Sequence, residues 1–414
     1  LTEKQGGGEA TVIAWIWART VKCPNPACGY TIPLVHSFDL SKKKGKEWHI
    51  ETIYEDGKIR FDVIQGRSKK EGTVDRRGAR CIHCGSPIKY SYIRDESCAY
   101  RMGSTLMAIV AEGKHGRIYL RPDQIQVDTA KVSLPEDYPQ GELAYYPGHL
   151  NTRVYGLDEF WKLFTPRQLT ALTTFSGLVQ EAQQKAEADA VAAGMSNDHL
   201  GLKDGGLGAK AYGEAVGVYL AFSVDKGANL WSSICSWMND RGAMRETFGR
   251  QAIPMTWDYA EANPFSNSGG NFLQFIERTA DTIADFPITY MTGTAIQANA
   301  QSDCGLRSIM VSTDPPYYDN IGYADLSDFF YVWLRQALQD TYPGLFSTML
   351  VPKVEELIAT PYRHEGSVEK AKDFFENGMI HTCQQIYQYA REDIPITIYY
   401  AYKQTDSSTN GNIS

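Results

Sequence analysis

The sequence predicts an α/β fold, and three groups of segments support this assignment. Residues 308–313 are short, apolar and rich in branched side chains, as expected of a buried strand. A stiff Pro-Pro loop follows, and then an amphipathic helix from residue 325. Two cysteine pairs enclose a predicted hairpin within residues 21–100, and helical patterns fill residues 165–238. We therefore expect an α/β domain, a small metal-binding module and a helical region.

Composition and length fit ordinary globular material. The 414 residues are 43% hydrophobic and 22% charged, enough for about two or three domains. The apolar run at residues 11–18 is too short to span a bilayer and lacks a signal-peptide cleavage pattern, so a cytoplasmic protein with no membrane partner is expected. The chain starts at Leu1 and ends in a polar string, which favours an internal fragment of a longer protein.

The charge is unevenly distributed. The net charge of −8 argues against a surface coated for nucleic acid, but residues 41–80 hold twelve Lys or Arg against seven Asp or Glu, a local charge of +5. A solvated charged loop is one interpretation of this run. Contact with phosphate backbones is the other.

Four of the eight cysteines form two closely spaced pairs: Cys23 with Cys28, and Cys81 with Cys84. A glycine follows each pair and permits the tight turn of a tetrahedral thiolate site, so a structural zinc ribbon is predicted over residues 21–100. Redox or incidental cysteines are the alternative. Three histidines are available as substitute ligands: His36, His49 and His83.

Two hairpins are expected in the first part of the chain. Residues 47–54 and 58–65 alternate apolar and polar side chains around an Asp-Gly turn, and basic segments at 42–46 and 67–80 flank them. A second hairpin is predicted from strands at 106–111 and 117–121. The first would lie between the two cysteine pairs.

The helical region has a marked start. Thr165 is a candidate N-cap, with Pro166 at the first helical position and Gln168 placed for a capping box, and this helix should end near residue 193. The glycine-rich residues 201–208 are interpreted as a linker, because no strand precedes them and no Lys-Ser or Lys-Thr follows. A second helix is predicted over residues 209–238. Its core-facing stripe is expected to comprise Tyr212, Val216, Tyr219, Leu220 and Trp231.

The candidate catalytic residues are Asp314, Pro315, Pro316 and Tyr317. A carboxylate and the Pro315 carbonyl offer two acceptors at fixed positions, and Tyr317 offers a flat face, so together they suit an exocyclic amino group. A surface turn is the alternative, because Asp-Pro and Pro-Pro are common turn dipeptides.

The elements after this loop complete the predicted α/β unit. The helix after the loop should be capped by Asp325, with Asp328 three residues on. A helix at 367–391 and a strand at 396–402, in the same sheet as residues 308–313, are also expected.

A second motif surrounds Pro264. The segment Pro264-Phe265-x-x-Ser268-Gly269 is similar to the glycine-rich cofactor motif of methyltransferases, although Asn263 replaces the usual acid and no clear apolar strand precedes it. Contact of Phe265, Ser268 and Gly269 with a cofactor, a loop flanking the target, and plain structure all remain open.

With these motifs in place, the chain resembles the zinc-ribbon-containing adenine-specific DNA methylases, S-adenosylmethionine-dependent amino-methyltransferases with an Asp-Pro-Pro-Tyr motif. The likeness covers nearly the whole chain and is carried by residues 15–28, 164–168, 247–251, 257–272, 314–333 and 361–364. It implies a partial Rossmann-like methyltransferase domain with an inserted zinc ribbon and a helical region. It also implies that the glycine-rich cofactor motif lies upstream of the ribbon.

The resemblance implies a division of labour along the chain. Residues 1–20 would be the end of an upstream methyltransferase half, and residues 21–100 would form the inserted ribbon. Residues 101–245 would form a hairpin and a helical region for target recognition, and residues 246–414 would form the catalytic half. The activity implied is methyl transfer from S-adenosylmethionine to the exocyclic amino group of adenine in DNA. Further residues expected near the substrate are Tyr318, Asp319, Asn320, Arg363 and His364.

Two rival functions remain at this stage. One is a nucleic-acid-binding zinc-ribbon module on an inactive methylase scaffold. The other is amino-methylation of cytosine, RNA or a protein amide, which related Pro-Pro-Tyr motifs also serve.

Overall fold

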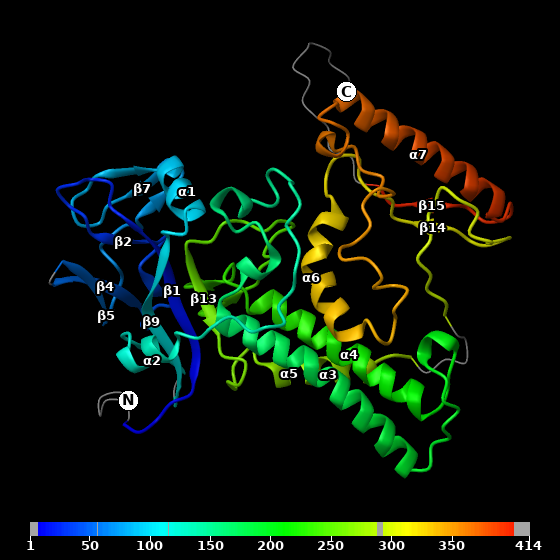
Figure 1. Cartoon of the computed structure of the whole chain (residues 1–414), viewed down its shortest axis with the longest axis horizontal. Coiled ribbons are helices and arrows are strands. Elements are labelled where there is room, and N and C mark those ends of the chain that lie inside the picture. Colours follow the sequence, from blue (N-terminus) through cyan, green and yellow to red (C-terminus); the bar gives the residue numbers. More distant parts are fainter. Residues whose placement is uncertain (1–6, 56, 115, 288–292, 401–414) are drawn as a thin grey trace. The chain divides into compact units, whose positions relative to one another are not determined.

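The computed structural model describes residues 7–55, 57–114, 116–287 and 293–400 (Figure 1). The chain divides into two compact units. The first comprises residues 1–287 and 327–350, and the second comprises residues 288–326 and 351–414. Each unit is described by itself below. The division of the chain into four functional segments stays a prediction.

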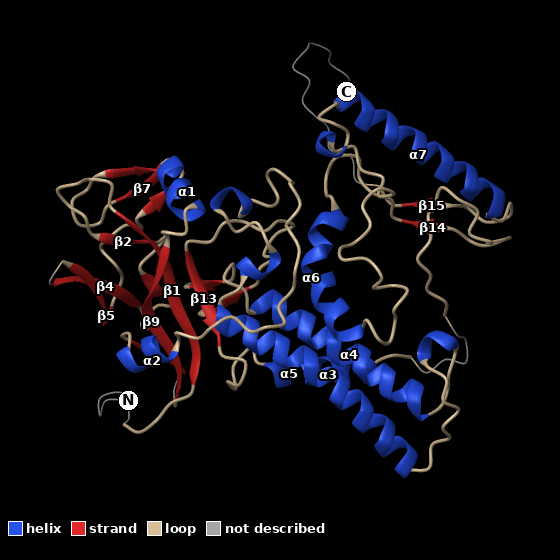
Figure 2. Ribbon diagram, in the orientation of Figure 1, coloured by secondary structure: helices blue, strands red, loops and turns tan. Residues whose placement is uncertain are grey.

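The first unit is built on an antiparallel sheet around β1 (Val12–Lys22). This strand pairs with β9 (Gly103–Gly113) on one side and with β13 (Asp258–Ala262) and then β2 (Thr31–Leu34) on the other, while β10 (Gly116–Leu120) pairs with β9 (Figure 2). An unbroken apolar run forms most of β1 because both its faces are covered. Ile16 packs in one buried cluster and Trp17 in another.

The cysteine-bearing region contains two small antiparallel sheets. The first joins β3 (Asp39–Ser41), β4 (Trp48–Glu55) and β5 (Lys58–Gln65). The second joins β6 (Val74–Asp75), β7 (Gly78–Arg80) and β8 (Pro87–Lys89), and α1 (Tyr90–Cys98) follows. Both predicted hairpins, β4–β5 and β9–β10, are confirmed.

The first unit contains the two helices predicted over residues 165–238, and a further helix, α5, that the sequence did not indicate. The helix α3 (Pro166–Ala192) begins with the expected capping box, in which Thr165 and Gln168 bond each other's backbone N–H groups. It packs on α4 (Ala209–Leu230), which in turn contacts α5 (Phe272–Ala284). At Gly213 a Cβ atom would lie 2.7 Å from the carbonyl oxygen of Gln183, so this close approach of two helices requires glycine.

The second helix of the region ends earlier than expected. It stops at Leu230 rather than residue 238, and residues 236–238 form β11 (Ser236–Met238), paired with β12 (Ala243–Arg245). The reason is a tertiary contact. The backbone N–H and the hydroxyl of the buried Ser233 both donate to the Leu163 carbonyl, at 2.8 and 2.9 Å, so this N–H does not continue the helix. The predicted stripe is also partly wrong, because Tyr212 is 49% exposed.

The second unit confirms that the last predicted strand joins the sheet of residues 308–313. Strand β14 (Ser312–Thr313) pairs in parallel with β15 (Thr397–Ile398), and α7 (Val368–Tyr389) begins at the N-cap Ser367. Residues 401–402 of the predicted last strand lie outside the described residues. The expected burial of residues 308–313 is wrong, because only Val311 is buried and Met310 is 67% exposed. A two-stranded sheet covers little of its own surface.

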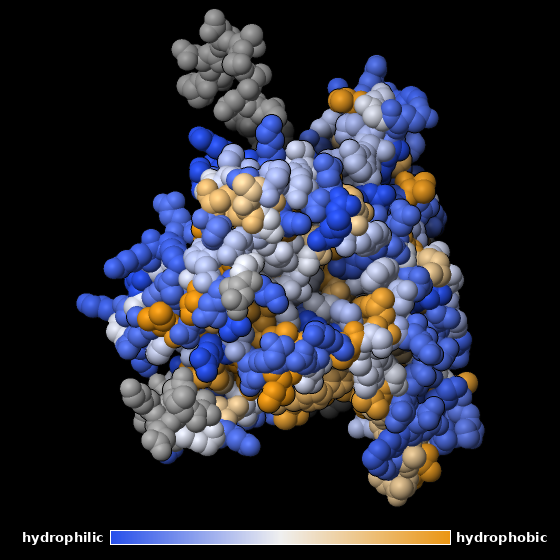
Figure 3. Space-filling model, turned by 60° about the vertical axis from the view of Figure 1, so that its left-hand side comes forward, coloured by the Kyte–Doolittle hydropathy of each residue, from blue (hydrophilic) through white to orange (hydrophobic). Residues whose placement is uncertain are grey.

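The fold class is therefore mixed α/β, with seven α-helices among the described residues. The named strands of the first unit all pair antiparallel, and β14–β15 is the parallel pair found in the described part of the chain. Hydrophilic residues cover most of the face seen in Figure 3, with hydrophobic residues in several patches. Among the described residues, no helix is both long and apolar enough to cross a membrane.

Candidate metal centre and candidate catalytic loop

The four paired cysteines come together in the first unit. Their sulfur atoms all lie within 4.8 Å of one another. The Sγ atoms of Cys23 and Cys84 are 3.7 Å apart, and those of Cys28 and Cys81 are 3.8 Å apart. These separations exclude disulfides, whose sulfurs lie about 2.05 Å apart. A tetrahedron with metal–sulfur bonds of about 2.3 Å has edges of about 3.8 Å, so the cluster can bind a metal ion of that kind.

Two short turns present these thiols. In the first, the Cys28 N–H donates to the Asn25 carbonyl at 2.9 Å, and in the second the Gly85 N–H donates to the Cys81 carbonyl at 2.9 Å. The glycine after each pair, Gly29 or Gly85, has φ of +65° or +75°, a backbone conformation that favours glycine. Although the two cysteine spacings differ, each pair ends in a turn closed by a glycine in the left-handed conformation.

The surroundings of the thiols differ in polarity. Burial raises the pKa of Cys23 to about 12, whereas hydrogen bonds from the side chain and backbone of Ser86 lower the pKa of the exposed Cys84 to about 6. A metal ligand must be a thiolate, so a bound cation would replace the proton on the buried sulfur. Metal binding at this centre is thus coupled to proton release.

The histidines are not needed as ligands. His83 Nδ1 lies 3.6 Å from the Cys28 sulfur, but its ring stacks on Tyr30 with centroids 4.0 Å apart. His36 pairs with Asp258 at 2.9 Å. Four thiolates already form a complete tetrahedral set.

The candidate catalytic loop lies in the second unit, where β14 ends. The N–H groups of Thr397 and Tyr399 donate to the carbonyls of Val311 and Thr313, at 3.1 and 2.8 Å. These bonds fix the strand up to the residue before Asp314. The Pro-Pro loop therefore leaves the carboxyl end of a parallel strand, as expected from the sequence.

Two of the four motif residues contact each other directly. The Tyr317 hydroxyl donates to Asp314 Oδ1 at 2.5 Å, and the Tyr317 ring meets the edge of Tyr400 with centroids 5.5 Å apart. The hydrogen bond to Asp314 raises the pKa of Tyr317, so the phenol stays protonated. Asp314 is exposed, and the other three motif residues are half-buried. The Asp314 carboxylate is thus accessible to a ligand, while its Oδ1 atom already accepts the Tyr317 hydroxyl.

The loop after the motif adopts an unusual backbone conformation. Tyr318 has φ of +47°, which costs a non-glycine residue about 1–3 kcal/mol. Its carbonyl accepts from the Ala359 N–H at 2.9 Å, and its ring packs edge-on against Phe375 at 5.2 Å. Asp319 and Asn320 are exposed beside it. These contacts hold the motif at a defined position in the second unit.

Asp325 is not the N-cap that the sequence indicated. The helix α6 (Tyr323–Leu338) begins two residues earlier, so Asp325 lies in its first turn, where it is 2% exposed. Arg363 pairs with it at 2.8 Å and with Glu356 at 2.7 Å, and the Tyr362 hydroxyl also donates to Asp325. Two carboxylates thus balance the charge of Arg363, which was expected near the substrate. Nothing in the local pattern indicated this cluster.

The Pro264 segment connects a strand to a helix, and its contact with a cofactor stays a prediction. The run before it is the strand β13, which the sequence did not indicate, and the loop leads to α5, capped by Asn271. Phe265 is 76% exposed, and Ser268 lines a cavity of the first unit. Lysine and arginine side chains surround that cavity, so it does not suit the positively charged sulfonium of S-adenosylmethionine.

No protein-family model, curated protein or solved structure matches the chain. A function for this protein is therefore argued from the chemistry of its residues.

Proposed function

We propose that this protein transfers a methyl group from S-adenosylmethionine to the exocyclic amino group of adenine in DNA. The observation that carries the proposal is the position of the Asp314 to Tyr317 motif at the carboxyl end of a parallel strand. In open α/β sheets, ligands bind at this end of the strands. A Rossmann-like arrangement of the parent domain is part of the same proposal.

The motif residues act on the amino group by holding it. Asp314 accepts one N–H bond and the Pro315 carbonyl accepts the other, which leaves the nitrogen lone pair directed away from both acceptors. The base leaves the duplex to reach them and stacks on Tyr317. Positioning of this kind supplies much of the rate, since the two reacting atoms are held at close range. S-adenosylmethionine supplies the methyl group when bound.

The hydrogen bond between Tyr317 and Asp314 gives the ligand-free arrangement of the site. It holds the carboxylate in one orientation, and an incoming amino group would replace the phenol as donor. Released from this bond, the Tyr317 ring could turn its face to the base. Adenine is preferred over cytosine in the proposal because the resemblance places Asp at the first motif position in adenine methylases.

We also assign zinc to the four-cysteine centre. Four thiolates and sulfur separations near 3.8 Å are typical of structural zinc, and a complete set of protein ligands leaves no position for a reacting water. The metal would thus stabilise the module without taking part in methyl transfer. A cytoplasmic location is consistent with reduced thiols.

The test measures transfer of labelled methyl from S-adenosylmethionine to DNA, RNA and protein by the wild type and by Asp314→Ala. Wild-type labelling of DNA, its loss in Asp314→Ala and unchanged cofactor affinity are expected. Asp373→Ala is the matched control, because Asp373 is an exposed carboxylate of α7 in the same unit and lies outside the motif loop. Retained transfer by Asp314→Ala would refute the assignment.

The second candidate function is nucleic-acid binding without methyl transfer. The four-cysteine cluster beside a segment with a local charge of +5 favours it. The same panel separates the two candidates: tight DNA binding by a wild-type protein that labels no substrate would favour a binding module.

A further inference from the structure

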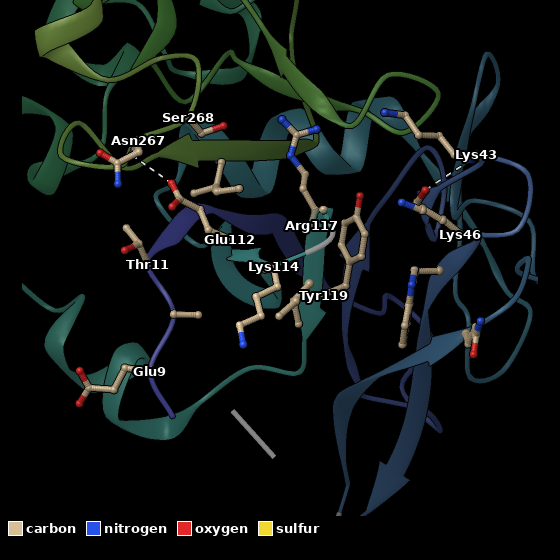
Figure 4. A pocket seen from close by; sticks show the side chains of 18 of the residues that line it. Glu9, Thr11, Lys43, Lys46, Glu112, Lys114, Arg117, Tyr119, Asn267 and Ser268 are labelled. Atoms are coloured by element: carbon tan, nitrogen blue, oxygen red, sulfur yellow. Dashed lines mark hydrogen bonds between the residues drawn. The ribbon is translucent and has the colours of Figure 1, made fainter. Parts of the chain in front are cut away.

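A cavity of about 1280 Å³ in the first unit is lined by cations from two segments of the chain (Figure 4). Lys43 and Lys46 come from the turn between β3 and β4, and Lys114 and Arg117 come from the hairpin of β9 and β10. The two segments are far apart in the sequence, and the packing of the β3–β4–β5 sheet against β9 and β10 brings them around one opening. We call this cavity the cationic groove.

The groove keeps most of its positive charge. In the part of the chain that the structure describes, Lys43, Lys114 and Arg117 form no ion pair. Arg117 instead lies over the Trp237 ring at 5.3 Å, a contact that leaves its charge in place. By contrast, Lys42 and Arg67 outside the groove both approach Asp39.

Two carboxylates line the groove, Glu9 and Glu112, against four cations, which leaves a local charge of +2 in a chain of net charge −8. Glu112 accepts the N–H of Asn267 at 3.0 Å, so one of the two is directed at the neighbouring loop (Figure 4). The field in the groove therefore favours anions.

Uncharged donors complete the lining. Ser41, Asn267 and Ser268 line the groove with Tyr119. Burial raises the pKa of Tyr119, so its hydroxyl stays protonated and can donate. Small-molecule sites usually enclose about 300–1,000 Å³, so the groove has room for a longer ligand. A chain of regularly spaced anions would meet several cations at once.

We propose that the cationic groove binds the sugar–phosphate backbone of DNA. The inference rests on the proposed function and names the surface that holds the nucleic acid. No lining side chain is required to recognise a base, so binding should be independent of sequence. The local excess of lysine and arginine in residues 41–80 thereby gains a structural basis in Lys43 and Lys46.

The salt dependence of binding tests the proposal quantitatively. If each of the four lining cations neutralises one phosphate, log K for a duplex falls with log salt at a slope of about −3.6. A rise from roughly 50 to roughly 200 mM salt should then weaken binding about 150-fold. Fluorescence anisotropy of a short labelled duplex gives this slope directly, and no methyl donor is needed.

Two single variants and one matched control locate the contact. Lys43→Gln and Lys114→Gln should each reduce the slope by about 0.9, so that the same salt change weakens binding only about 40-fold. Lys44→Gln removes the same charge from the same turn, but Lys44 does not line the groove. Its slope should match the wild type.

Several results would overturn the proposal. A Lys44→Gln effect equal to that of Lys43→Gln would mean that only overall charge matters. Heparin binding that responds equally to Lys43→Gln and Lys114→Gln would indicate a general polyanion site. Unchanged slopes in a Lys43→Gln/Lys114→Gln double variant with wild-type zinc content would show that DNA binds elsewhere.

Failure of this inference can be told from failure of the proposed function. Asp314→Ala should bind DNA as tightly as the wild type while it loses methyl transfer. The groove variants should bind more weakly and still transfer methyl at saturating DNA. Methyl transfer by the wild type, together with unchanged DNA binding by the groove variants, would overturn the groove proposal alone.

Discussion

Replacement of Arg363 by methionine is expected to destabilise the second unit by about 3–5 kcal/mol. The Arg363 side chain is 13% exposed, and its partners Asp325 and Glu356 are 1% and 16% exposed. Burial alone lowers the pKa of Arg363, but the hydrogen bond and charge of Asp325 outweigh burial and raise it above its ordinary value. Methionine would therefore leave two poorly hydrated carboxylates without their cation.

Hydrogen exchange followed by mass spectrometry measures this effect on peptides of α7 and residues 361–363. A loss of about 3–5 kcal/mol speeds exchange through opening of the unit by about a hundredfold to a few thousandfold. Arg391→Met is the matched control, because its pair with Asp393 at 2.6 Å is exposed to solvent and should contribute little to stability. Arg363→Met exchange within tenfold of the wild type would refute the reasoning.

Three further predictions concern the first unit. Cys81→Ser should reduce bound zinc from one per chain to substoichiometric levels and lower the melting temperature, as measured by atomic absorption and calorimetry; full occupancy would contradict the four-thiolate centre. Thr165→Ala should cost about 1 kcal/mol in urea unfolding, and no change would show that the capping box is dispensable. The hydrogen bond to Asp258 raises the pKa of His36, so the protonated ring stabilises the folded state. His36→Gln should therefore lower the melting temperature at about pH 6 and have little effect at about pH 9, where the wild-type ring is neutral. Equal melting-temperature differences at the two pH values would contradict this prediction.

Local chemistry was predictable from the sequence. The Thr165 capping box, the Asp-Gly hairpin and the two cysteine turns each depend on residues within a few positions, and all of them form as expected. A shared sheet for residues 396–402 and 308–313 was also predicted, because short apolar runs flank the predicted helices, and residues 397–398 do pair with residues 312–313.

Features that depend on distant partners were not predictable. Glu261 lies in the strand β13 and is 5% exposed, because Arg167, 94 positions away, pairs with it at 2.6 Å. A glutamate in a Tyr-Ala-Glu-Ala run argues against a buried strand as long as the ion-pair partner of the glutamate is unknown. Asp325 was misinterpreted for the same reason, since its partner Arg363 lies 38 positions on.

The groove shows the same limit for a functional surface. Lys43 and Lys114 belong to different hairpins, and only the pairing of β9 and β10 and the packing of the small sheet bring them to one cavity. The sequence indicated a basic segment but not which of its lysines share a surface. Ser268, one of the candidate cofactor residues, also lines this groove, which the sequence did not indicate.

The most direct test of the proposed function is nucleoside mass spectrometry of duplex DNA incubated with the protein and S-adenosylmethionine. The account predicts N6-methyladenine in DNA treated with the wild type, and none above background with Asp314→Ala. Equal amounts of N6-methyladenine with both proteins, or methylated DNA that contains only another modified base, would contradict it.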